Sequence, residues 1–276
     1  MSKTRILYVS QAIQPFLPES PISKASRVIP QSIHERGREI RVFMPRFGVI
    51  NERRHQLHEV IRLSGMNLNV NDTDHPLIIK VASIPTARMQ VYFIDNEQYF
   101  KKKVTWFDAK DKLVPDNDER AIFFARGVLE TVRKLSWAPD IIHCHGWMTS
   151  LVPLYAKQMF QGDAHFENTK IISSIYDEGF NGTLNGSLHE KVAYDGISPE
   201  LVQDIKLPTF DALNKIAMEH SDAVVCGSEA LPTETQEAFN ALTQPTMRYM
   251  EPELSSAEMT TFYDSILEGK QEAVEG

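Results

Sequence analysis

Short apolar runs alternate along the chain with stretches in which apolar residues recur at helical spacing. The runs that suit strands buried on both faces cover 5–10, 39–44, 141–145, 170–176 and 222–226. Helical spacing of apolar residues covers 23–36, 116–135, 151–155 and 210–220. Strands that alternate with helices in this way form right-handed crossovers in a parallel sheet. The pattern therefore predicts an α/β fold with a parallel sheet flanked by helices.

Two parts of the chain depart from this alternation. Residues 46–95 contain alternating or apolar segments separated by Asn, Asp, Pro and Gly, which predicts a small antiparallel β insertion. Residues 246–276 form an acidic tail, in which one amphipathic helix is predicted over 255–267. The last eight residues are predicted to be disordered. The main domain is accordingly predicted to span 1–245.

Composition, charge and cysteine positions argue against several classes of protein. A formal net charge of −8 argues against nucleic-acid binding, because a phosphate backbone requires a basic face. The chain has no apolar run of about 18 residues, so no membrane span is predicted. Cys144 and Cys226 stand inside apolar runs, which favours buried free thiols over a disulfide. The apolar start of the chain is too short for a signal peptide. Together these observations predict a cytoplasmic protein.

The densest polar chemistry stands at the end of the run 141–145, in the letters D-I-I-H-C-H-G-W. A spacing of two places His143 and His145 on one face of a strand, and Gly146 permits a sharp turn after it. Parallel sheets bind ligands at the carboxyl ends of their strands. No metal site is predicted, because neighbouring strand residues cannot bring three ligands together. The histidines are therefore either buried, hydrogen-bonded residues or ligand contacts, and Trp147 either stacks on a ligand or belongs to the core.

The stretch D-I-I-H-C-H-G-W-M-T-S-L-V-P-L-Y resembles a motif of bacterial glycogen synthases and plant starch synthases. Further blocks, among them Y-V-S-Q-A-I-Q-P-F and H-S-D-A-V-V-C-G-S, are similar to the same family in the same order, over residues 3–235. The resemblance implies the N-terminal, Rossmann-like half of a GT-B glycosyltransferase. Enzymes of this family transfer glucose from a nucleotide-sugar to an α-1,4-glucan without a metal. The implied partners are therefore α-glucan and nucleotide-sugar, and no cofactor is expected.

The chain departs from the family pattern at a loop that contacts glucose and phosphate. The family has Lys-X-Gly-Gly-Leu there, and the matching positions run from Pro18 to Ile22. The lysine cation is lost, and so are the glycines that let backbone N–H groups approach a phosphate. The sugar-binding candidates that remain are Ser20, Ile22, His143, His145 and Trp147.

Two other places differ as well. Gly146 stands where the family's His-Asp-Trp motif has its aspartate, so a carboxylate that could bind a sugar hydroxyl is missing. Tyr176 and Asp177 replace a His-Asn pair, and a tyrosine cannot become a cation near neutral pH. Tyr176 and Asp177 are the catalytic candidates that remain. The adjacent Asp177 and Glu178 form either a general acid/base couple or a polar loop after a strand.

Enzymes of this family hold the nucleotide with a second Rossmann domain, for which we expect no counterpart in this chain. The preferred hypothesis is a degenerate glycogen synthase-like domain, inactive alone, whose cleft binds glucan or a nucleotide-sugar. One alternative is an active glucosyltransferase subunit that a partner chain completes. The other is a non-enzymatic module whose cleft face binds a protein partner or forms a homodimer.

Overall fold

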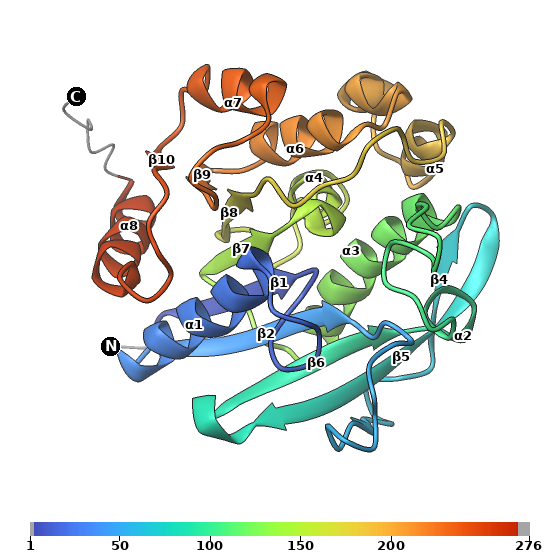
Figure 1. Ribbon diagram of the computed structural model, residues 1–276, viewed down its shortest axis with the longest axis horizontal. Coiled ribbons are helices and arrows are strands. Elements are labelled where there is room, and N and C mark those ends of the chain that lie inside the picture. The colour runs from blue at the N-terminus through green and yellow to red at the C-terminus, as the bar shows by residue number, and fades with distance from the viewer. Residues whose placement is uncertain (1–2, 270–276) are drawn as a thin grey trace.

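A computed structural model describes residues 3–269 and contains one ten-stranded sheet with helices on both faces (Figure 1). The strand order is β10-β9-β8-β7-β1-β2-β6-β5-β3, and β4 pairs with β5. The strands are β1 (Arg5–Ser10), β2 (Glu39–Pro45), β3 (His58–Glu59), β4 (Met66–Val70), β5 (Thr73–Ile84), β6 (Met89–Asp95), β7 (Ile141–His145), β8 (Lys170–Ile175), β9 (Ala223–Cys226) and β10 (Thr246–Met247).

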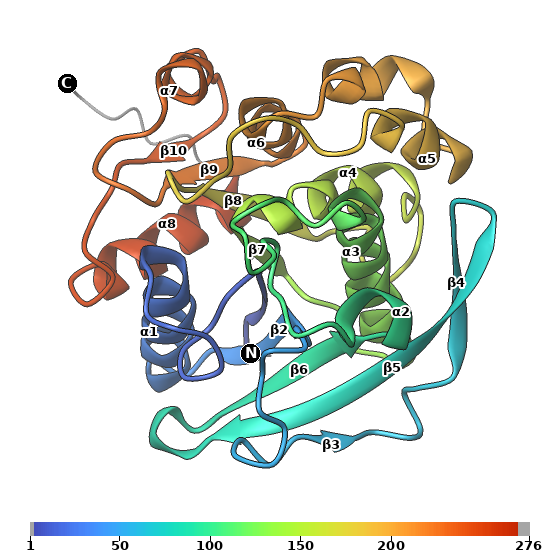
Figure 2. The same cartoon turned by 45° about the vertical axis from the view of Figure 1, so that its right-hand side comes forward.

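Helices cover both faces of the sheet because the chain adds strands on both sides of β1. On one side, α1 (Pro21–Glu35) leads from β1 to β2 and packs against α8 (Ser256–Glu268), as Figures 1 and 2 show. On the other side lie α3 (Asn117–Lys134), α4 (Leu151–Gln158) and α6 (Phe210–Glu219). Right-handed crossovers require this arrangement, since β2 and β7 flank β1 on opposite sides. Further helices are α2 (Glu97–Phe100), α5 (Leu188–Tyr194) and α7 (Thr233–Asn240), with 3₁₀ turns η1 (Pro85–Ala87), η2 (Trp147–Thr149) and η3 (Pro199–Lys206).

The central strands are parallel, as the alternation of strands and helices predicts. Leu7 in β1, for example, stands between Ile142 of β7 and Arg41 of β2 in parallel register. The predicted α/β fold is thereby confirmed. The antiparallel part consists of β5 with its partners β3 and β4. β6, which the sequence pattern groups with the antiparallel segments, pairs parallel with β2 and antiparallel with β5. Because most of its residues are buried, it belongs inside the main sheet.

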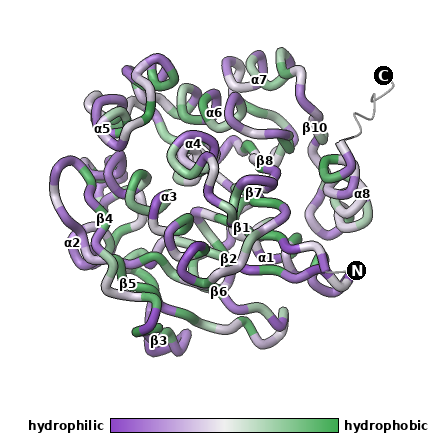
Figure 3. Tube along the Cα trace, turned by 180° about the vertical axis from the view of Figure 1, so that it is seen from behind, coloured by the Kyte–Doolittle hydropathy of each residue, from purple (hydrophilic) through white to green (hydrophobic). Residues whose placement is uncertain are grey.

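The apolar core consists of one large cluster through the sheet and a smaller one around β9, α6 and α7. Figure 3 shows hydrophobic residues along the central strands of the large cluster. The helix α8 contributes Met259, Tyr263 and Ile266 to this core, each at most 5% exposed. α8 lies where the sequence predicts a helix over 255–267. The division of the chain at 245 into a domain and a tail remains a prediction. The disorder predicted for the last eight residues concerns positions that, beyond Gly269, lie outside the described residues.

Two observations bear on the expected environment of the chain. No helix within residues 3–269 has the length and apolar character needed to cross a membrane. Cys144 and Cys226 are buried free thiols, as predicted. Burial raises the pKa of both thiols, so neither is a reactive thiolate near neutral pH.

Candidate functional site

The strand order reverses between β1 and β7, which marks the candidate site. After β1 the chain continues to β2 on one side of it, and later to β7 on the other. In open α/β sheets, ligands bind outside the carboxyl ends of the strands at such a reversal. Gln11 follows β1 and Gly146 follows β7, and the Gln11 backbone N–H donates a hydrogen bond to the carbonyl of His145 (3.1 Å).

Position 146 needs a glycine for two reasons, its backbone conformation and the close approach of Gln11. Its φ of 87° and ψ of 161° belong to a region that is open almost only to glycine. A Cβ atom there would lie 2.6 Å from the side-chain carbon and oxygen of Gln11. The Gln11 side chain instead accepts a hydrogen bond from the Met148 backbone N–H (3.2 Å). An aspartate at this position would need the space that Gln11 fills.

Buried polar atoms without a hydrogen-bond partner gather around this turn. They are Gln11 Nε2, His145 Nε2, Trp147 Nε1 and Ser150 Oγ. All four side chains are at most 2% exposed. Because buried polar groups are nearly always hydrogen-bonded, such a cluster is typical of a place where a ligand or ordered water binds.

The two histidines lie side by side on one face of β7, as their spacing predicts, but only one has a free nitrogen. Their ring centroids are 4.2 Å apart. His143 is bonded at Nδ1 to the Tyr263 hydroxyl (2.6 Å) and at Nε2 to the Ser174 hydroxyl (2.7 Å). His145 is bonded at Nδ1 to the Tyr176 hydroxyl (2.8 Å). Burial lowers the pKa of His145 to about 3 and lowers that of His143 well below its usual range, so both rings are neutral.

The start of α1 holds a carboxylate from the loop that follows β8. Ser20 caps the helix by accepting the Ser23 backbone N–H (3.2 Å). The Ile22 backbone N–H donates to Glu178 Oε1 (2.5 Å), and the Ser20 side chain also hydrogen-bonds Glu178. Burial raises the pKa of Glu178, and these two hydrogen bonds oppose the rise. A carboxylate is stabilised at a helix N-terminus, where backbone N–H groups and the helix dipole favour negative charge. The start of α1, where the resemblance leads one to expect a phosphate-binding loop, is thus occupied by the protein's own carboxylate.

Tyr176 and Asp177 have different surroundings. Tyr176 is 3% exposed, and its ring lies so close to Gly227 that a Cβ there would be 2.5 Å away. Burial raises the pKa of its hydroxyl, so Tyr176 stays neutral and protonated near neutral pH. Asp177 is exposed at the rim and accepts a hydrogen bond from the Ser228 hydroxyl (2.7 Å).

A cavity of about 440 Å³ opens at this rim. Its lining combines two aromatic rings with carboxylate and amide side chains: Asp177, Phe180, Asn181, Phe210 and Asp211, besides Gly179, Gly182, Thr209 and Pro232. Phe180 packs edge-on against Trp147, with ring centroids 5.0 Å apart. The candidate Trp147 therefore supports the floor of this cavity from below, and at 1% exposed it belongs to the core.

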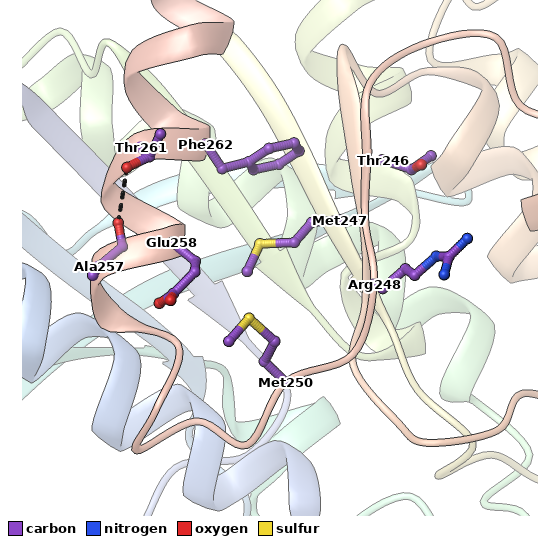
Figure 4. Close-up of a pocket in the computed structure, with 8 residues that line it drawn as sticks. All are labelled: Thr246, Met247, Arg248, Met250, Ala257, Glu258, Thr261 and Phe262. Carbon is purple, nitrogen blue, oxygen red and sulfur yellow. Dashed lines mark hydrogen bonds between the residues drawn. The ribbon is translucent and has the colours of Figure 1, made fainter. Parts of the chain in front are cut away.

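A larger cavity of about 560 Å³ lies at the edge of the sheet, between β10 with its following loop and α8. Figure 4 shows Met247, Met250 and Phe262 facing one another across it, while Arg248 points away. The lining of this cavity also includes Glu258, Thr246 and Thr261. The smaller cavity is the better candidate because it lies beside Asp177, just after the central strand β8. Among residues 3–269, no three His, Cys, Asp or Glu side chains are placed to hold a metal ion.

Several residues of the site escape prediction from the pattern. Gln11 carries a weak signal, since it is a polar residue directly after a buried strand. Phe210 and Asp211 follow the helical pattern of α6, which conceals their position at the cavity. Tyr263 lies 120 positions from His143, and no local pattern connects the two residues.

Comparisons with known proteins agree with this geometry. The family model described as the starch synthase catalytic domain matches residues 5–244. Glycogen synthase of Chlorobium limicola is 34% identical over 227 residues, which cover 81% of this chain and 45% of that protein. Glycogen synthase of Chlorobium luteolum is 36% identical over 198 residues, covering 71% of this chain and 40% of that protein. The chain thus spans about half the length of the curated relatives it matches.

A solved structure supports the fold. The catalytic domain of starch synthase IV from Arabidopsis thaliana, bound to ADP and acarbose, superposes with a TM-score of 0.67 and 17% sequence identity. The match covers 96% of this chain and 50% of that chain. At this identity the likeness concerns the fold alone.

Proposed function

Because the chain belongs to the glycogen and starch synthase family of GT-B glycosyltransferases, we propose that its strand-end rim binds α-glucan and that the chain does not transfer glucose by itself. The observation that carries the proposal is Glu178 at the start of α1, where its carboxylate bonds the Ile22 N–H. A nucleotide-sugar brings phosphates, and phosphoryl groups need cations or free N–H donors. Lys24, in the first part of α1, is already paired with Glu253 (2.9 Å).

The rim cavity suits a neutral sugar better than an anion. Carboxylates and amides accept and donate hydrogen bonds to sugar hydroxyls, and aromatic rings cover the apolar faces of a sugar ring. Asp177 and Asp211 line the cavity and would repel a phosphate.

The proposal is tested by titrating the ¹⁵N-labelled chain with maltoheptaose and, separately, with ADP-glucose. We expect saturable binding of maltoheptaose on the order of 1 mM and no binding of ADP-glucose at that concentration. Phe180→Ala should weaken maltoheptaose binding roughly three- to tenfold, because it removes an aromatic contact. Tyr194→Ala, an exposed aromatic outside the cavity, is the matched control. Unchanged affinity in Phe180→Ala would contradict this site.

Activity is tested with labelled ADP-glucose, and then UDP-glucose, as donor and glycogen as acceptor. We expect no transfer above a heat-killed control from the purified chain. Transfer by the chain alone would overturn the proposed inactivity and return attention to Tyr176 and Asp177.

A second candidate, an active subunit completed by a partner chain, is favoured by the unsatisfied atoms of Gln11, His145 and Trp147. In that case transfer should appear when a separate nucleotide-binding domain of a synthase is added, and His145→Ala should abolish it.

A protein partner or a homodimer over the same face is tested by the mass in solution, and a strict monomer that captures no protein would exclude it. We place the protein in the cytoplasm, which fits its two free thiols.

A further inference from the structure

A chain of buried hydrogen bonds connects α8 with the candidate site. The Tyr8 hydroxyl bonds the Tyr263 hydroxyl (3.2 Å), which bonds His143 Nδ1 (2.6 Å). His143 Nε2 bonds the Ser174 hydroxyl (2.7 Å), and Ser174 also hydrogen-bonds Tyr176. Tyr176 then bonds His145 Nδ1 (2.8 Å). Every side chain in this chain of bonds is at most 3% exposed, so water does not compete for the donors and acceptors.

The chain of bonds has a direction, because each hydroxyl and each neutral imidazole has one hydrogen to donate. If Tyr263 donates to His143 Nδ1, His143 carries its hydrogen on Nε2 and donates to Ser174. Ser174 then donates to Tyr176, and Tyr176 donates to His145 Nδ1. His145 consequently carries its own hydrogen on Nε2, the atom that has no partner within residues 3–269.

The opposite direction leaves more groups unsatisfied. It would make Tyr8 the last donor, and the described residues offer the Tyr8 hydroxyl no bonded acceptor besides Tyr263. It would also leave His145 Nε2 as a buried acceptor without a donor. Each buried unsatisfied polar group costs about 1–3 kcal/mol. In the first direction only the His145 Nε2–H is left over, and it lies at the strand ends.

We propose that Tyr263 of α8 is a positioning residue, which through His143, Ser174 and Tyr176 holds His145 in the Nε2–H form. This leaves the Nε2–H of His145 as an unpaired donor beneath the strand ends, for the oxygen of a ligand or ordered water that reaches it. That the ligand is a glucan rests on the proposed function, whereas the tautomer of His145 is a property of the free chain. The contact joins the end of the described chain to a strand 120 positions earlier.

The test is to determine the tautomers of the histidine rings from their ¹⁵N chemical shifts, by long-range ¹H–¹⁵N NMR on the ligand-free protein. We expect the Nε2–H form at both His143 and His145. In Tyr263→Phe the hydroxyl is lost while the ring remains. We expect the Nδ1 resonance of His143 to move, both histidines to show a mixture of tautomers, and maltoheptaose to bind about fivefold more weakly, which corresponds to one hydrogen bond.

Asp264→Asn is the matched control. Asp264 lies on α8 beside Tyr263 and forms an ion pair with Arg38 (2.6 Å), which the substitution weakens. Within residues 3–269, no hydrogen bond joins Asp264 to a member of the chain of bonds. The control should leave both histidine spectra unchanged even if α8 becomes less stable. An Nδ1–H form at His145 in the unmodified chain, or a His145 spectrum unchanged in Tyr263→Phe, would overturn the proposal. Normal spectra with no maltoheptaose binding would instead contradict the proposed function and leave the role of Tyr263 intact.

Discussion

At the scale of single residues, the glycine at position 146, where the sequence resemblance leads one to expect an aspartate, fits closely against its neighbour Gln11. The Gln11 side chain lies where a Cβ of residue 146 would be, and its oxygen accepts a hydrogen bond from the Met148 backbone N–H. The space that a side chain at position 146 would need is therefore filled by a side chain from the end of β1. The glycine and the position of Gln11 form one structural feature.

We expect Gly146→Ala to lower the free energy of unfolding by about 3 kcal/mol, from backbone strain and from contact with Gln11. Gly182→Ala is the control, because Gly182 has a similar φ of 86° but open space around it. The control should cost about 1 kcal/mol. Urea unfolding measures both values. Adding Gln11→Ala should recover part of the loss in Gly146→Ala, and strictly additive effects would show that Gln11 is not the cause.

The sequence predicts some residues of the site well and others poorly. The spacing of two correctly places His143 and His145 on one face of β7, because side chains of a strand alternate. It cannot show that His143 has both nitrogens occupied while His145 keeps one free. That difference depends on Tyr263 and Ser174, which come from other elements of the fold.

At the scale of elements, the start of α1 and the loop after β8 act together. Local sequence explains why α1 begins where it does, since Ser20 and Ser23 form a reciprocal cap. Glu178 adds a second acceptor from 156 positions away. A helix start that is filled in this way has less capacity to bind an external anion.

Glu178→Ala should destabilise the first turn of α1 by about 1 kcal/mol, because it removes a charged acceptor at the helix N-terminus. Hydrogen exchange of the Ile22 amide should then be about fivefold faster, as that free energy implies. Glu178→Gln keeps an oxygen acceptor and should give a smaller effect. Glu237→Ala, an exposed position on α7, is the control. Exchange at Ile22 that does not change in Glu178→Ala would contradict the contact.

At the scale of the whole molecule, α8 joins the same core as the strands. Met259 and Ile266 pack into it, and Tyr263 reaches the two buried histidines. Ion pairs between Arg38 and Asp264 and between Lys24 and Glu253 hold α8 and its preceding loop to the α1 side of the sheet. The candidate site is therefore supported by residues from both ends of the described chain.

The buried neutral histidines make global stability depend on pH. The pKa of His145 is lowered to about 3 in the folded chain, while an unfolded histidine titrates near 6.5. Between these values the unfolded chain binds more protons, so stability falls as the pH falls from about 6.5 and is fully present above it. His145 alone should contribute a slope of about 1.4 kcal/mol per pH unit.

Urea unfolding between pH 4.5 and pH 7.5, a range on both sides of the usual histidine pKa, measures this slope. His145→Asn, which keeps a hydrogen-bonding side chain without a titrating ring, should flatten it by that amount. Carboxylates such as Glu178 are present in both proteins, so their contributions cancel in the comparison. His58→Asn, on an exposed strand, is the control. Parallel profiles for the unmodified chain and His145→Asn would show that His145 is not the cause.

The sequence by itself determined the parallel α/β architecture, the buried thiols, the shared face of the two histidines and the altered loop between Pro18 and Ile22. These properties follow from local periodicity and from which residue types stand at strand ends. Only the tertiary structure decided that β6 joins the parallel sheet, that Glu178 fills the start of α1 and that Tyr263 reaches His143. The physical reason is that a buried polar group takes whichever partner the packed elements bring within hydrogen-bond distance. That partner stands far along the chain, where no local pattern records it.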